Sequence, residues 1–119
     1  MPDPARRRYD AELLRAEQTD DPAVAWASLE VAHILSQPWA RPHVRCHLAM
    51  LKLALRTRDG REICGQLIRI TVAGPGSLAG RYPEGNTGRS DVPATRPMPV
   101  PPDLALLIQG DDGDADNRG

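Results

Sequence analysis

Residues 29–47, which read LEVAHILSQPWARPHVRCH, predict two helices joined by a short bend. Gln37 and Arg41 each precede a proline, and a residue before proline is disfavoured in helical geometry. We therefore expect the bend over residues 37–41, with Pro42 opening the second helix at a position where a missing backbone N–H costs nothing. A helical hairpin built on these residues places the chain among helical folds.

Capping patterns predict the other helix boundaries. The Asp-Pro pair at residues 21–22 is an N-cap followed by proline at the first helical position. Asp59 and Glu62 have capping-box spacing, and the Gly74-Pro75 pair is expected to end the last helix. The four predicted helices span about residues 3–18, 22–36, 42–57 and 59–74. The sequence therefore predicts an all-α fold of two antiparallel helical hairpins.

The composition changes at residue 75. Residues 1–74 hold five of the 12 prolines, whereas residues 75–119 hold the other seven prolines and seven of the ten glycines. The run PMPVPP at residues 97–102 is typical of polyproline II, and Asp103 is expected to cap a short helix that ends near Gln109. We expect one small domain with three parts: a helical part over 1–74, an extended Pro/Gly-rich tail packed on it over 75–109, and a disordered acidic end over 110–119.

The overall composition argues against several classes of function. The 119 residues carry a formal net charge of −1, which offers no general attraction for nucleic acid or an anionic membrane. No stretch approaches the roughly 20 apolar residues of a membrane span, and the N-terminus lacks the apolar run of a secretory signal. Two cysteines are too few for a disulfide framework. These features predict a reduced, cytoplasmic protein.

The three histidines of the chain all lie near the predicted bend. They form the patterns Glu30-x-x-His33 before the bend and His43-x-x-x-His47 after it. Residues three or four apart share one face of a helix, so each pattern places two ligand-type side chains together. Folding the hairpin sets Glu30 opposite His47 and His33 opposite His43. The sequence therefore predicts that these four side chains converge on one point, where they could hold a metal ion.

Three nitrogens and one oxygen suit Zn²⁺, Fe²⁺, Ni²⁺ or Cu²⁺ by ligand type. Cys46 lies three residues after His43, and a sulfur ligand from it would move the preference toward Zn²⁺ or copper(I). Carboxylate-bridged di-iron bundles need two Glu-x-x-His motifs, and this chain has one. A mononuclear site is therefore the simpler interpretation.

A second interpretation treats the histidines as structural. Buried histidines are often satisfied by hydrogen bonds alone, and a buried cysteine such as Cys46 is usually part of the core. An enzyme is a third and more distant hypothesis, because no separate acid, base or oxyanion motif accompanies the histidines.

The segment 20–35 resembles the second helix of a tetratricopeptide repeat. The matching positions are Asp21, Ala25, Leu29, Glu30, Ala32 and Leu35. Glu30 belongs to that pattern, so its presence does not by itself indicate a metal. This likeness implies helical-hairpin packing and a groove for a protein or peptide partner, whereas true arrays stack at least three repeats. The oligomeric state is left open.

Four stretches together resemble a bacterial family known as domain of unknown function 3703. They are LEVAHIL at residues 29–35, PHVRCHLAML at 42–51, GNTG at 85–88 and RPMPVP at 96–101. The likeness extends to about residue 109 and implies a small stand-alone protein whose tail belongs to the fold, with no assigned activity. The chain departs from the family pattern at Ser36, where glycine is usual and enters the left-handed conformation more readily.

Overall fold

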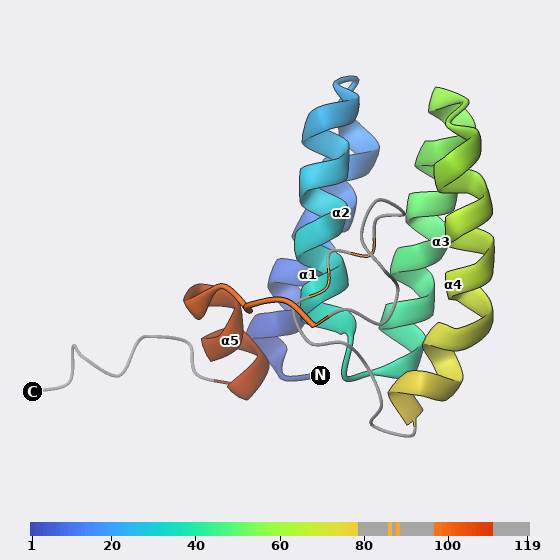
Figure 1. The fold of residues 1–119 in the computed structure, drawn as a ribbon. Coiled ribbons are helices and arrows are strands. Elements are labelled where there is room, and N and C mark those ends of the chain that lie inside the picture. The colour runs from blue at the N-terminus through green and yellow to red at the C-terminus, as the bar shows by residue number, and fades with distance from the viewer. Residues whose placement is uncertain (79–85, 87, 89–96, 111–119) are drawn as a thin grey trace, which may run out of the picture.

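The computed structural model describes residues 1–78, 86, 88 and 97–110, and these residues are entirely helical or irregular. The helices are α1 (Asp3–Gln18), α2 (Pro22–Ser36), α3 (Ala40–Thr57), α4 (Gly60–Leu78) and α5 (Pro102–Gln109). The four long helices form two antiparallel hairpins, α1 with α2 and α3 with α4, and α5 packs against the first (Figure 1). The predicted all-α architecture with a short C-terminal helix is confirmed.

Two of the predicted helix starts are formed by the expected side chains. The Asp21 carboxylate accepts a hydrogen bond of 2.9 Å from the backbone N–H of Ala23, with Pro22 in the first turn. At the start of α4, Asp59 accepts a hydrogen bond of 3.2 Å from the N–H of Glu62. Each carboxylate satisfies a backbone donor that has no partner inside its helix.

The bend between α2 and α3 is shorter than predicted. Arg41 is helical although Pro42 follows it, because α3 already begins at Ala40. Pro42 thus lies in the first turn, where no helical hydrogen bond is lost. Gln37 also keeps helical backbone angles, so the expectation of a bend over 37–41 was wrong at both ends. Ser36 needs no left-handed conformation, since it is the last residue of α2 and its hydroxyl donates to the His33 carbonyl.

Helix α4 continues past its predicted end. The Gly74-Pro75 pair was expected to terminate it, but α4 runs to Leu78. Proline removes one helical hydrogen bond and crowds the carbonyl four residues earlier. That penalty weakens a helix without preventing one further turn. The predicted limit of the helical part at residue 74 therefore lies inside α4.

Helix α2 is the centre of the fold, because it packs against α1 on one side and α3 on the other. Small residues such as Ala25 and Ala32 are fully buried along it, which lets the neighbouring helices approach closely. Tyr9 of α1 is also buried, and its hydroxyl donates to the Pro42 carbonyl of α3 over 2.8 Å. Burial raises the pKa of this phenol. No helix in the described part of the chain has the length and apolar content needed to cross a membrane.

In the described part of the tail, two apolar side chains pack against the core of the helices. Leu104 of α5 is buried at 2% exposure, and Val100 packs against the same core. Asp103 does not cap α5. It lies in the first turn, where a negative charge is still favourable, while Pro101 occupies the N-cap position. The predicted disordered end over 110–119 lies outside the described residues except for Gly110.

One residue beyond α3 offers a direct test of backbone strain. Arg58 adopts the left-handed conformation with φ 57° and caps the helix through its backbone N–H. Glycine reaches this conformation without a Cβ penalty. We expect Arg58→Gly to raise the free energy of unfolding by about 0.5–1 kcal/mol, measured by urea denaturation. Arg56→Gly, inside α3, should lower it by about as much. Equal effects of the two substitutions would contradict the assigned cap.

Candidate metal centre

The three histidine rings meet in the interior between α2 and α3. His33 comes from the last turn of α2, and His43 and His47 lie one turn apart on α3. The Nε2 atom of His33 is 3.0 Å from that of His47 and 3.1 Å from that of His43. All three side chains are buried, with 2–5% exposure. The predicted convergence of the histidines therefore holds, and their ligand atoms lie within 4.8 Å of one another.

The outward nitrogen of His33 is held by the backbone of a segment that follows α4. Its Nδ1 lies 2.6 Å from the carbonyl oxygen of Asn86. A carbonyl oxygen only accepts hydrogen bonds, so Nδ1 must carry the hydrogen. In a neutral imidazole the other nitrogen then has a free lone pair. The Nε2 atom of His33 thus faces the cluster as an acceptor.

The outward nitrogen of His47 is held in the same way by a side chain of α4. Its Nδ1 lies 2.7 Å from Oε1 of Gln66. The orientation of that amide is determined by its other contacts, because Nε2 of Gln66 donates to the Gly88 carbonyl at 2.8 Å and to the Glu62 carboxylate at 3.1 Å. The Gln66 oxygen therefore faces His47, and Nδ1 of His47 is the donor. The Nε2 atom of His47 is left with its lone pair directed inward.

The three neutral imidazoles have fewer N–H hydrogens than their close nitrogen contacts need. His33 and His47 both use their one neutral-state hydrogen on outward partners. At most one hydrogen, that of His43, remains for two close contacts between Nε2 atoms. At least one contact must then bring two lone pairs together, which is repulsive. A cation between these nitrogens removes the repulsion.

A proton is a poor candidate for that cation. Burial lowers the pKa of His33 well below its ordinary value, and the neighbouring His47 and His43 lower it further. Burial also lowers the pKa of His47, to about 4, with a smaller contribution from the charge of Arg69. Near neutral pH both imidazoles are therefore neutral, which is the protonation state that binds metal.

The other two predicted ligands are placed differently. Cys46 is fully buried, and its thiol donates to the Leu29 carbonyl at 3.4 Å. Burial raises the pKa of Cys46, which disfavours the thiolate that binds metals. Glu30 is partly buried on α2. Neither residue belongs to the group of described ligand atoms that the three histidines form.

The residues around the histidines were not predicted as part of the site. Gln66 and Glu62 lie one turn apart on α4. The sequence pattern indicates only a capping role for Glu62, through its spacing from Asp59, and it predicts no role for Gln66. Asn86 and Gly88 belong to the stretch GNTG, which entered the sequence analysis only through the family resemblance. The signal available for Gln66 was a polar residue one turn after a capping glutamate, with no local feature to connect it to His47.

Gly88 lies directly against the His33 ring. A Cβ atom at this position would be 2.7 Å from Cδ2 of His33, and the φ angle of Gly88 is +82°. Its N–H donates to the Asn86 side chain and its carbonyl accepts from Gln66, so this glycine connects the partners of both histidines. Any larger residue must displace the ring or the backbone.

Two glycine-to-alanine substitutions test this contact. We expect Gly88→Ala to lower the free energy of unfolding by about 2–3 kcal/mol, because overpacking and positive φ both oppose it. Gly60→Ala is the matched control, since a Cβ there meets nothing within 4 Å. It should raise stability by about 0.5–1 kcal/mol. Urea denaturation measures both, and a Gly88→Ala protein as stable as the wild type would rule out the described contact.

Comparison with known protein families identifies the chain. Residues 3–108 match the family described as "Protein of unknown function (DUF3703)". The chain belongs to this family. The match covers all five helices up to Ile108 in α5, so the histidine cluster and the C-terminal helix both lie within the family region. Comparisons with curated proteins and with solved structures found no significant match.

Proposed function

We propose that this member of the DUF3703 family binds a divalent transition metal ion through Nε2 of His33, His43 and His47. One observation supports the proposal above all. The hydrogen bonds to Asn86 and Gln66 direct two imidazole lone pairs at each other across 3.0 Å in a buried site. Metal-binding histidines commonly donate their second ring N–H to a carbonyl or carboxylate, which fixes the tautomer in this way.

Two of the three separations between the histidine nitrogens also fit a metal ion. Two imidazoles on a tetrahedral zinc ion, with bonds of about 2.0–2.1 Å, hold their nitrogens about 3.3 Å apart. The Nε2 separations of 3.0 and 3.1 Å are close to that value. Imidazole ligands suit Zn²⁺, Fe²⁺, Ni²⁺ and Cu²⁺, and the buried Cys46 thiol gives no reason to favour copper(I).

Three protein ligands leave a coordination position for a further group. Structural zinc sites are usually closed by four protein ligands, whereas three-ligand sites exchange water or small molecules. Glu30 remains a prediction for the fourth position. We infer metal handling as the role. We place it in the cytoplasm, because an exposed free thiol such as Cys64 suits a reducing compartment.

Metal analysis of protein produced without a histidine tag tests the proposal. We expect about one metal ion per chain after purification, and less than about a tenth of that in His43→Ala and His47→Ala. Cys46→Ala should retain the metal, and Glu30→Gln decides whether that carboxylate takes part. Wild-type protein that is folded, free of metal and unable to take up added Zn²⁺, Ni²⁺, Cu²⁺ or Fe²⁺ would contradict the proposal.

A further inference from the structure

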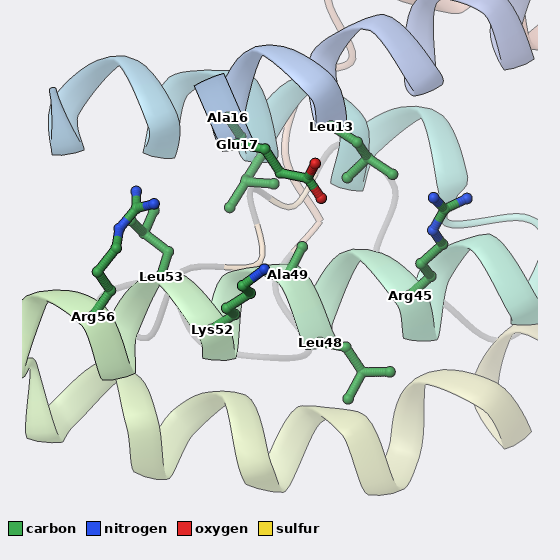
Figure 2. A pocket seen from close by; sticks show the side chains of 10 residues that line it. Leu13, Ala16, Glu17, Arg45, Leu48, Ala49, Lys52, Leu53 and Arg56 are labelled. Atoms are coloured by element: carbon green, nitrogen blue, oxygen red, sulfur yellow. The ribbon is translucent and has the colours of Figure 1, made fainter. Parts of the chain in front are cut away.

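A groove runs between α1 and α3 on the side of the molecule where both helices flank α2. It encloses about 340 Å³ and has an apolar floor that includes Leu13, Leu29 and Leu53. Figure 2 shows Leu13 and Glu17 of α1 facing a row of α3 side chains that includes Arg45 and Arg56. Because α1 and α3 each pack against α2 and pack little against each other, the space between them stays open.

A second hollow continues this groove toward the N-terminus of α3. It encloses about 720 Å³ and shares Arg45 with the first. Arg6, Arg41 and the partly buried ring of Trp39 line it, and none of the described residues that line it is acidic. The two hollows together form one long surface, which we call the α1/α3 groove.

The α1/α3 groove is strongly basic in a chain whose net charge is −1. Five cationic side chains line it and one acidic side chain, Glu17, opposes them. The five are exposed, and within the described residues none of them makes an ion pair. The cationic residues are Arg6, Arg41, Arg45, Lys52 and Arg56. Within the described lining, Glu17 offsets one of these five charges and leaves an excess of four positive charges.

We propose that the α1/α3 groove binds an acidic amphipathic helix of a partner protein. The cations of α3 extend from Arg41 to Arg56, which at about 1.5 Å per residue is roughly 22 Å, or four helical turns. That length exceeds a small anion and matches a helix laid along the groove. Apolar residues of such a helix would lie on the leucine floor, and its carboxylates would face the basic rim.

The chemistry of the groove favours a protein over other anionic partners. Single-stranded nucleic acid binds on repeated aromatic platforms, whereas the described lining of the groove offers one partly exposed aromatic residue, Trp39. The apolar leucine side chains below the rim offer no favourable contact to a charged phosphate backbone. The groove does not include the histidine cluster, so this inference goes beyond metal binding and is independent of it.

Fluorescence anisotropy with a labelled synthetic peptide tests the proposal. The probe is a helix of about 16 residues with leucine at positions i, i+3, i+4 and i+7 and glutamate on the other face. We expect saturable binding to the full-length protein that weakens as salt increases. Lys52→Glu/Arg56→Glu should weaken it at least about tenfold. The double variant Arg15→Glu/Arg61→Glu makes the same reversal of charge at exposed positions outside the groove and should change binding less than about twofold.

Several outcomes would overturn the proposal. They are equal binding by both double variants, equal binding of a peptide with lysine in place of glutamate, and equal binding of a scrambled peptide of the same composition. Tighter binding of single-stranded DNA or of phosphatidylserine vesicles would assign the groove to another partner class. A stable dimer in sedimentation that Lys52→Glu/Arg56→Glu dissociates would assign it to a second copy of the chain. Circular dichroism confirms that each variant is folded before it is compared.

Discussion

Zn²⁺ added to the metal-free protein is expected to raise the midpoint of thermal unfolding by about 10–20 °C. An ion that binds the folded state alone stabilises it by RT ln(1 + [L]/Kd), about 4 kcal/mol when the free ion exceeds Kd a thousandfold. For a chain of 119 residues, each kcal/mol moves the midpoint by roughly 3–5 °C. The unfolded chain does not hold His33, His43 and His47 together, so little of this energy is lost to competing binding.

Matched variants separate this effect from weak surface binding. His33→Gln and His47→Gln should each abolish most of the shift, while Cys46→Ala should keep it. A chelator added in excess should return the wild-type midpoint to that of the metal-free protein. A shift of the same size in a variant lacking all three histidines would show that Zn²⁺ acts elsewhere on the chain.

The helices and the convergence of the histidines could be predicted because both depend on local spacing. Asp21 and Asp59 cap helices through backbone groups two or three residues away, and such contacts are visible in sequence. His43 and His47 share a face because a helix turns once in 3.6 residues. The convergence with His33 then required only a short bend.

The bend itself shows the limit of local reasoning. A residue before proline tends to avoid helical geometry, yet Arg41 is helical because α3 begins before it. A preference of this kind is weak compared with the packing of a whole helix. Here α3 packs against both α2 and α4, and Tyr9 of α1 donates a hydrogen bond to the Pro42 carbonyl in its first turn.

The groups that orient the histidines could not be predicted, because they come from distant parts of the chain. Asn86 is 53 residues from His33, and Gln66 is 19 residues from His47. No local pattern encodes which side chain of α4 will face α3, or where Asn86 and Gly88 will lie. The need for glycine at position 88 is evident only from the structure, because the His33 ring lies too close to leave room for a Cβ atom.

The metal-free protein is expected to lose about 3 kcal/mol of stability from His47 alone as the pH falls from 7 to 4. The pKa of His47 is about 4 in the folded protein, against an ordinary value of 6.5 in the unfolded chain. Below pH 6.5 the unfolded chain takes up a proton that the folded protein refuses, so unfolding becomes more favourable as acid is added. The stability is fully present above pH 6.5 and is lost as the pH falls toward 4. The lowered pKa of His33 acts in the same direction.

Urea denaturation at about pH 7.5, 6, 5 and 4.5, with a chelator present, measures this dependence. Carboxyl groups begin to titrate only below about pH 5, so a loss between pH 6.5 and 5 comes from the histidines. His47→Gln should flatten that part of the profile while leaving the part below pH 5 unchanged. Glutamine keeps much of the volume and has no proton to gain. A wild-type stability that is constant from pH 7 to 5 would mean that the imidazoles are already charged or reach water, and the opposed lone pairs that support metal binding would then not exist.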